Sequence, residues 1–371
     1  IPLLKQWYQR RVHGGCLPSI IIFFVQPHRG MAGGLLSTGI PFTKIPDSYV
    51  RPESQRPLLS DVPQCRSAPV VDLDAAVPSV VVTQIRRACL SHGFFQVVNH
   101  GVGEEVASGM LAAAAEFFRL PEEEKLRLRS DDPTRTVRLS TSFNVAKETV
   151  HNWRDYLRLH CHPLEHHTPD WPSNPPSFKD AVSGYCREVR ALGLRLEEAL
   201  SESLGLEKDH IKKATEEQGQ HMAVNYYPPC PQPELTYGLP AHTDPNTLTI
   251  LLQDGDVSGL QVLIDAQWLA VDPLPGAFIV LIGDQLQALS NGRYKSVRHR
   301  AVVNSERERI SVASFLCPAE EAVIGPAERL TGGVDGGSAG AVYRSFTYAE
   351  YYEKFWSRNL EQEHCLELFR K

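Results

Sequence analysis

The chain has 371 residues, a formal net charge of −6 at pH 7, and 42% apolar and 22% charged residues. This composition is typical of a soluble globular protein with one large domain or two ordinary ones. The acidic balance, without a long basic run, argues against a nucleic acid partner. Because no apolar run reaches the roughly 18 residues that a membrane span needs, we expect no membrane partner either.

The amino-terminal end is unusual because the chain begins with Ile1 and its first methionine is Met31. A basic stretch and then a short apolar run precede that methionine, as in a secretory signal, but the apolar core is at the short limit for one. We therefore interpret residues 1–30 as translated upstream sequence with the natural start at Met31. We expect residues 1–40 to lack structure.

Eight cysteines occur without a CxxC pair or a zinc-ligand spacing, at positions 16, 65, 89, 161, 186, 230, 317 and 365. Several of them lie inside apolar helix or strand patterns. We interpret them as reduced core residues, which is typical of a cytoplasmic protein. We expect that protein to be a monomer with no obligate protein partner.

The first half of the chain alternates strand and helix patterns. Apolar spacing and capping residues predict strands at 69–73 and 94–98 and helices at 79–92, 103–119, 121–128 and 176–204. The last of these helices has one apolar stripe, formed by Tyr185, Val189, Leu192, Leu196 and Leu200. These elements predict a mainly helical amino-terminal region.

The second half is rich in short strands separated by Pro, Gly and Asp turns. We predict strands at 222–227, 247–253, 260–264, 268–271, 278–282 and 311–316. Many short strands at this spacing indicate a sandwich or barrel. The predicted fold is therefore α+β: a jelly-roll (double-stranded β-helix) core at about 218–318, behind a helical amino-terminal region and followed by a carboxy-terminal helix.

The carboxy-terminal helix has an aromatic face with helical spacing, formed by Tyr348, Tyr351, Tyr352, Phe355 and Trp356. Packing against the barrel and a lid over a substrate site are both compatible with this face.

A metal site is predicted by His242, Asp244 and His299. Successive side chains of a strand point to opposite faces, so His242 and Asp244 share a face and can bind one metal ion. The buried-strand run that follows them within residues 238–254 (GLPAHTDPNTLTILLQD) places them at a strand end. Two imidazoles and one carboxylate form the facial triad of non-haem Fe(II) oxygenases, which leaves metal positions open for substrate and O₂.

An acid-binding arginine is predicted beside this metal. Arg309 and Ser311 share one face of a strand, and the segments 296–304 and 309–316 look like the two halves of a hairpin around a turn at 304–307. Such a hairpin would bring His299 and Arg309 close together.

Two further signatures lie at residues 92–101 (HGFFQVVNHG) and 225–231 (NYYPPCP). With the triad and the Arg-x-Ser pair, they make the chain from Tyr49 to its end resemble the plant 2-oxoglutarate-dependent dioxygenases. Four segments, at 138–144, 152–160, 171–176 and 355–365, resemble the downy-mildew-resistance-six group, which includes salicylate hydroxylases and type I flavone synthases. The resemblance divides the chain into an amino-terminal region at 41–175 and a catalytic region at 176–371.

The resemblance implies Fe(II) as cofactor, 2-oxoglutarate and O₂ as co-substrates, and ascorbate as a stimulant. The far carboxylate of 2-oxoglutarate needs a bidentate cation, which Arg309 offers better than a lysine would. Ser311 adds a hydroxyl on the same face. Tyr227 and Asn225, carried over from the Asn-x-Tyr signature, are expected to add hydrogen bonds. The expected reaction converts the 2-oxo acid to succinate and CO₂.

The expected substrate is a small phenolic, with Phe143, Phe315, Arg138 and Arg158 as pocket residues and Arg154 as a further available cation. Salicylate hydroxylation to 2,3- or 2,5-dihydroxybenzoate, which would limit salicylate-dependent defence, is the first hypothesis. Desaturation of a flavanone such as naringenin is the second, and a non-catalytic small-molecule-binding protein is the third. Ala223 stands where related flavonoid oxygenases have a lysine, which indicates a different or smaller substrate. We interpret His100 and His221 as structural.

Overall fold

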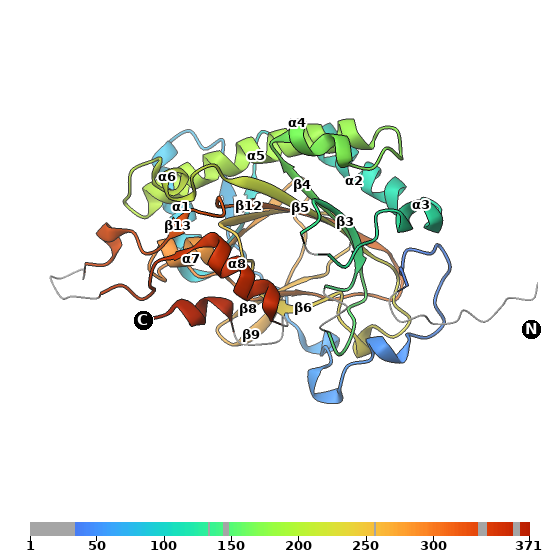
Figure 1. Ribbon diagram of the computed structural model, residues 1–371. Helices are drawn as coiled ribbons and strands as arrows, with labels where there is room; N and C mark the ends of the chain where they lie inside the picture. Colours follow the sequence, from blue (N-terminus) through green and yellow to red (C-terminus); the bar gives the residue numbers. More distant parts are fainter. Residues whose placement is uncertain (1–33, 133, 144–147, 256, 333–339, 359–363) are drawn as a thin grey trace, which may run out of the picture. The chain divides into compact units, whose positions relative to one another are not determined.

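The computed structural model describes residues 34–132, 134–143, 148–255, 257–332, 340–358 and 364–371 (Figure 1). Residues 32–371 form one compact unit. The interpretation of residues 1–30 lies outside the described residues. The expectation that the chain lacks structure up to residue 40 is wrong from residue 34 onward, because Leu35 and Leu36 are buried and the backbone N–H groups of Leu36 and Ser37 donate to Asp155.

Two β-sheets confirm the jelly-roll prediction. The large sheet has the strand order β1-β2-β10-β7-β12-β5-β4-β3, and the small sheet has the order β6-β11-β8-β9. The strands of the large sheet are β1 Val70–Asp72, β2 Phe94–Val98, β3 Val137–Thr141, β4 Asp155–His162, β5 Gly219–Tyr227, β7 Leu248–Gln253, β10 Phe278–Ile282 and β12 Arg309–Cys317. Those of the small sheet are β6 Leu239–His242, β8 Leu260–Ile264, β9 Gln267–Val271 and β11 His299–Ala301, and β13 Val323–Ile324 pairs with β14 Phe346–Thr347.

A buried apolar cluster lies between the two sheets. Leu251, Ile279 and Ala313 of the large sheet meet Leu260 and Val262 of the small sheet in this cluster. Strands β1 to β4, from the amino-terminal region, are hydrogen-bonded into the same sheet as β5, β7, β10 and β12. The amino-terminal and catalytic regions therefore share one core.

Helices pack against the large sheet on its other face (Figure 1). The longest, α5 (Phe178–Ser203), buries its predicted apolar stripe in a cluster with Ile250 and Leu316. Gly193 permits this close approach, because a Cβ there would lie 2.5 Å from Leu316 Cδ1. The other α-helices are α1 Pro78–Ser91, α2 Glu104–Phe118, α3 Glu122–Leu126, α4 Leu164–His167, α6 His210–Thr215, α7 Asp284–Leu289 and α8 Tyr348–Ser357. The 3₁₀ helices are η1 Asp47–Tyr49, η2 Glu53–Gln55, η3 Leu59–Asp61, η4 Thr168–Asp170, η5 Pro233–Leu235, η6 Glu328–Leu330 and η7 Cys365–Phe369.

The predicted hairpin between residues 296–304 and 309–316 is wrong. β11 pairs with β6 and β8 in the small sheet, whereas β12 pairs with β5 and β7 in the large sheet. The turn itself exists, because Asn304 Oδ1 accepts the backbone N–H groups of Glu306 and Arg307. It connects two sheets instead of two neighbouring strands, a distinction that residue alternation cannot make.

The seven cysteines in the described part of the chain are buried and form no disulfide, as predicted for core thiols. Among the described helices, none is both long enough and apolar enough for a bilayer span.

Glu197, on α5, generates a pH-dependent prediction. Burial raises the pKa of Glu197 to about 7, although Gln218 Nε2 donates to it at 2.9 Å and Arg190 lies near. An unfolded Glu titrates near pKa ~4.3, so between these two pKa values the folded state binds a proton that the unfolded state has lost. The free energy of unfolding therefore falls as pH rises through this range, by about 4 kcal/mol in total. Glu197→Gln should remove this loss.

The measurement is urea denaturation of wild type and Glu197→Gln at pH 5 and pH 8. The free energy of unfolding of the variant should increase relative to that of wild type as pH rises. The control is Glu198→Gln, because Glu198 is the exposed neighbour of Glu197 and pairs with Lys208. Its free energy of unfolding should depend on pH as that of wild type does. Parallel pH profiles for wild type and Glu197→Gln would contradict the raised pKa.

Candidate metal centre and adjoining cavities

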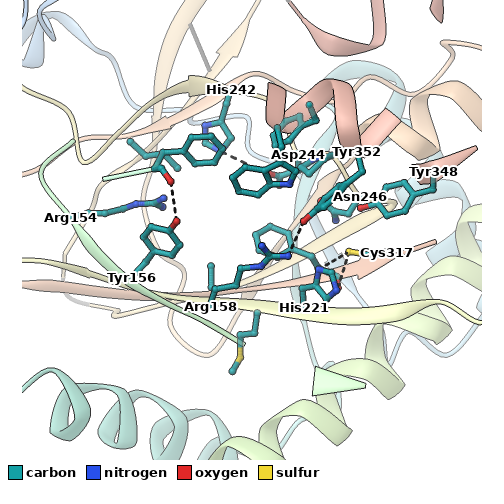
Figure 2. Close-up of a pocket in the computed structure, with 18 residues that line it drawn as sticks. Arg154, Tyr156, Arg158, His221, His242, Asp244, Asn246, Cys317, Tyr348 and Tyr352 are labelled. Carbon is teal, nitrogen blue, oxygen red and sulfur yellow. Dashed lines mark hydrogen bonds and ion pairs between the residues drawn. The ribbon is translucent and has the colours of Figure 1, made fainter. Parts of the chain in front are cut away.

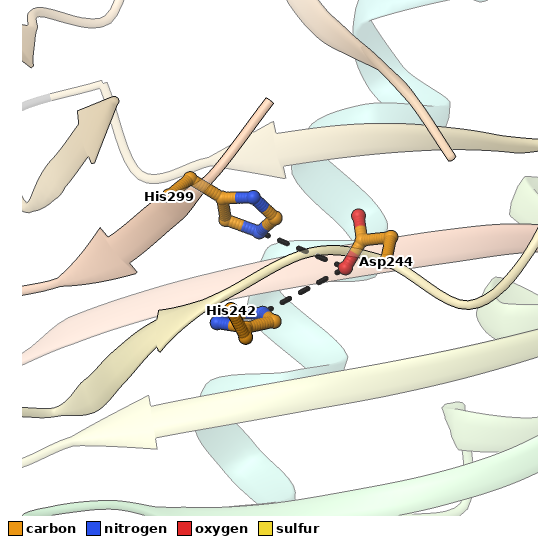
Figure 3. A group of neighbouring side chains, drawn as sticks. All are labelled: His242, Asp244 and His299. Carbon is orange, nitrogen blue, oxygen red and sulfur yellow. Dashed lines mark ion pairs between the residues drawn. The ribbon is translucent and has the colours of Figure 1, made fainter. Parts of the chain in front are cut away.

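Strand register brings the predicted metal ligands together. His242 ends β6, His299 begins β11, and the antiparallel pairing of these strands sets the two residues directly opposite each other. Their Nε2 atoms lie 3.7 and 3.6 Å from Oδ1 of Asp244, as Figure 3 shows. Within the described ranges, this is the one group of three or more His, Cys, Asp or Glu side chains whose ligand atoms could hold a metal ion.

Backbone contacts orient both imidazoles toward a common point. His242 Nδ1 lies 2.9 Å from the carbonyl of Pro240, and His299 Nδ1 lies 3.1 Å from that of Val297. A proton on each Nδ1 donates to that carbonyl and leaves Nε2 as the free ligand atom. Burial, followed by the charge of His299, lowers the pKa of His242 well below its usual value, so its imidazole is neutral as metal binding requires.

The carboxylate of Asp244 is held by Thr249. Its Oδ2 accepts a hydrogen bond from Thr249 Oγ1 at 2.6 Å, so that Oδ1 faces the two imidazoles. Burial raises the pKa of Asp244, and the His299 charge and the Thr249 hydroxyl oppose this effect. A buried carboxylate between two imidazoles is an electrostatic arrangement that a divalent cation stabilises. The donor set therefore fits Fe(II).

A second buried carboxylate, Asp284, supports the turn that contains Thr243 and Asp244, and no sequence pattern predicted this role. It accepts hydrogen bonds from Thr243 Oγ1 at 3.2 Å, from Tyr351 and, at 2.9 Å, from the His364 ring, while its own N–H donates to the carbonyl of Asp244. Its partners come from α8 and the carboxy-terminal end of the chain. Asp284 therefore ties both of these segments to the metal-ligand turn.

The predicted co-substrate residues line one cavity together with the triad. Arg309 and Ser311 of β12 stand opposite Tyr227 and Asn225 of β5. Arg309 is buried, and its Nη2 donates to Gln253 Oε1 at 2.6 Å. Its Nε has no hydrogen-bond partner within the described part of the chain. A buried guanidinium with an unused donor fits a carboxylate ligand.

A second cavity has aromatic walls (Figure 2). Like the first cavity, it is lined by His242 and Asp244. The rings of Phe143 and Trp356 stack with centroids 5.0 Å apart and planes within 4°. Tyr352 and Phe355 of α8 also line this cavity, as does Phe315. Both earlier interpretations of the last helix apply in part. Tyr351 is buried against Asp284, whereas the other residues of the aromatic face, Tyr348, Tyr352, Phe355 and Trp356, wall the cavity.

Two of the three candidate arginines line the aromatic cavity. Arg158 donates from Nη2 to the hydroxyl of Tyr352 at 2.8 Å, and Arg154 lies at the opposite side in Figure 2. Arg138 is not among the lining residues, because its guanidinium reaches the hydroxyl of Tyr156 instead. Asp244 is the one carboxylate among the described residues that line this cavity.

His221 also lines the aromatic cavity, although the sequence suggested a structural role. Its ring stacks on His160 at 3.9 Å. Burial and the charge of Arg158 lower the pKa of His160 to about 3, and burial and the charge of His160 lower that of His221, so both rings are neutral. The available signal was alternation along β5, which puts His221 on the same face as Ala223 and Asn225. His100 bonds the carbonyl of Gly276 instead.

Two segments of the chain match known protein families. The 2OG-Fe(II) oxygenase superfamily matches residues 218–318, and the family described as non-haem dioxygenase in morphine synthesis N-terminal matches residues 68–178. The solved structure of JOX2 in complex with 2OG, Fe and JA is similar with a TM-score of 0.80 and 36% sequence identity, covering 90% of this chain and 96% of that one.

Two relatives are similar over nearly their whole length. Protein DOWNY MILDEW RESISTANCE 6 of Arabidopsis thaliana is 63% identical over 339 residues, which cover 91% of this chain and 99% of the relative. Flavanone 3-dioxygenase 2 of Oryza sativa subsp. japonica is 63% identical over 336 residues, which cover 91% and 97%.

The chain therefore belongs to the 2OG-Fe(II) oxygenase superfamily and is a 2-oxoglutarate-dependent dioxygenase that uses Fe(II). Within the superfamily it is a plant oxygenase of the DOWNY MILDEW RESISTANCE 6 group.

Thr249 generates a prediction for metal binding. Thr249→Val keeps the side-chain shape but removes the hydrogen bond that orients Asp244, so Fe(II) affinity should fall about 10- to 100-fold. Thr247→Val is the matched control, because the buried Thr247 hydroxyl has no partner among the described residues. The measurement is an anaerobic Fe(II) titration of both variants and wild type. Equal affinities for Thr249→Val and wild type would show that Thr249 does not support the ligand.

Proposed function

We propose that His242, Asp244 and His299 bind Fe(II) and that Arg309 binds the distal carboxylate of 2-oxoglutarate. Ser311, Asn225 and Tyr227 complete the co-substrate site. The triad geometry and the buried Arg309 with its unused Nε support these assignments. The iron, when bound, supplies oxidising chemistry by activating O₂ together with 2-oxoglutarate, which becomes succinate and CO₂.

The chain's own residues position the reactants and exclude water. Arg309 fixes one end of the co-substrate, so that its other end reaches the triad. Phe143, Trp356 and Phe315 provide apolar walls against which a planar ring can pack. These walls keep the substrate ring beside the triad and limit the access of water to the reaction.

The substrate proposed first is salicylate, hydroxylated to 2,3- or 2,5-dihydroxybenzoate. The observation that carries it is that two guanidinium groups, those of Arg154 and Arg158, line an aromatic-walled cavity beside His242 and Asp244. A buried guanidinium is stabilised by an anionic ligand, and the ligand's ring matches the aromatic walls. Arg158, beside Tyr352, is the residue proposed to bind the salicylate carboxylate. By consuming salicylate, the enzyme would limit salicylate-dependent defence.

The second candidate is the desaturation of a flavanone such as naringenin to a flavone, which is the reaction of a type I flavone synthase. The relative named Flavanone 3-dioxygenase 2 and the stacked aromatic walls favour it. A neutral flavanone, however, provides no charge for the two arginines. A non-catalytic binding role is disfavoured, because the three proposed metal ligands lie together and line one cavity with Arg309.

The test is turnover by protein loaded anaerobically with Fe(II), offered salicylate and naringenin separately with 2-oxoglutarate and O₂. We expect succinate in step with a salicylate product heavier by one oxygen atom. A naringenin product lighter by two hydrogen atoms would establish the flavone synthase, and one heavier by an oxygen atom would establish flavanone hydroxylation. Product from naringenin alone would overturn the salicylate proposal.

Arg158→Gln should raise the KM for salicylate about 10- to 100-fold, because a charge-assisted hydrogen bond to the carboxylate is lost. Turnover of naringenin, if present, should change little. Arg138→Gln is the control, since Arg138 lies outside the cavity lining. Steady-state kinetics measure both variants. An unchanged KM for salicylate in Arg158→Gln would exclude Arg158 as its partner.

A further inference from the structure

Arg154 belongs to both cavities. It directly precedes β4, and its side chain reaches the interior with those of Tyr156 and Arg158, as alternation along a strand requires. Arg154 lines the aromatic cavity and also the cavity of Arg309, and both cavities include His242 and Asp244. Figure 2 shows its guanidinium directed into the aromatic cavity.

The guanidinium of Arg154 is held on three sides by uncharged groups. Its Nε donates to the carbonyl of Ser142 at 2.9 Å, and its Nη1 donates to Asn225 Oδ1 at 2.9 Å. The aromatic ring of Tyr156 lies 4.4 Å from it. Arg154 is only 5% exposed, and within the described ranges it forms no ion pair and its Nη2 forms no hydrogen bond. It is thus a fixed, desolvated cation without a counter-charge, which is costly unless a ligand supplies an anion.

Asn225 connects Arg154 with the Arg309 end of the co-substrate cavity. Its Oδ1 accepts from Arg154, while its Nδ2 lies 3.4 Å from the hydroxyl of Ser311. A 2-oxo acid whose distal carboxylate binds Arg309 and whose other end reaches the triad lies in a cavity that Asn225 also lines. Its metal-proximal carboxylate then arrives where Arg154 and His242 line the same cavity.

We propose that Arg154 binds the metal-proximal carboxylate of 2-oxoglutarate, as a second co-substrate arginine besides Arg309. This proposal rests on the proposed function for the position of the metal and for the role of Arg309, but not on the identity of the aromatic substrate. Because Arg154 also holds the carbonyl of Ser142, next to Phe143, the same side chain joins the co-substrate to the wall of the aromatic cavity.

The test is calorimetric binding of 2-oxoglutarate to Fe(II)-loaded full-length protein without O₂, followed by binding of salicylate to the resulting complex. In Arg154→Gln, the Kd for 2-oxoglutarate should rise about 10- to 100-fold, because a charge-assisted contact is lost, while the Kd for salicylate changes by less than about threefold. Arg158 lies further along the same strand face, beyond Tyr156. In Arg158→Gln, the Kd for salicylate should rise while the Kd for 2-oxoglutarate changes little.

Arg154→Lys keeps the charge but loses the fork geometry, and should give an intermediate Kd for 2-oxoglutarate. Thermal unfolding and Fe(II) content identify any variant that fails to fold or to load, and Arg154→Lys then provides the comparison. Unchanged 2-oxoglutarate binding in Arg154→Gln would overturn the proposal, as would a rise confined to salicylate, which would assign Arg154 to the substrate. Loss of 2-oxoglutarate affinity in a protein that does not oxidise salicylate would support Arg154 while removing the substrate assignment.

Discussion

The pairing of β11 with β6 is the constraint on which the rest of the site depends. It places His299 directly opposite His242 at the edge of the small sheet, and Asp244 lies two residues beyond the end of β6, so the three proposed metal ligands meet at this edge. The large sheet faces this point and supplies Arg309 from β12 and Asn225 from β5. The proposed metal ligands His242 and His299 and the proposed co-substrate residues therefore belong to different sheets, and the packing of the two sheets sets the distance between them.

Positive charge organises the space between the sheets. Arg309 lines the cavity that includes all three triad residues, Arg154 lines both this cavity and the aromatic cavity, and Arg158 lines the aromatic cavity beside Tyr352. Each is buried, and a buried cation favours a ligand that brings an anion. A dicarboxylate co-substrate and a substrate carboxylate together match this arrangement, whereas a neutral flavanone brings no anion to it.

Local sequence patterns predicted the parts of the site that a single strand or turn determines. The shared face of Arg309 and Ser311 follows from alternation along β12. Strand alternation does not place Asp244, because β6 ends at His242 and Asp244 lies in the turn that follows, although the two side chains do come together as predicted. β4 was missed although Leu157, Leu159 and Cys161 alternate along it as buried apolar residues. The residues between them, Tyr156 and Arg158, face a cavity. Strand pattern also cannot say which sheet a strand joins, which is why the hairpin at 304–307 was wrong. Asp284 was missed because its partners come from distant segments of the chain.

The most direct test is an anaerobic titration of the Fe(II)-loaded protein with 2-oxoglutarate, followed by visible charge-transfer absorption before and after salicylate is added. We predict a band that forms with 2-oxoglutarate, is absent in His299→Ala, and is shifted but not lost when salicylate binds, because the two cavities meet at one metal. No band in the loaded wild type, or a band that salicylate abolishes by displacing 2-oxoglutarate, would contradict two separate cavities at a shared iron.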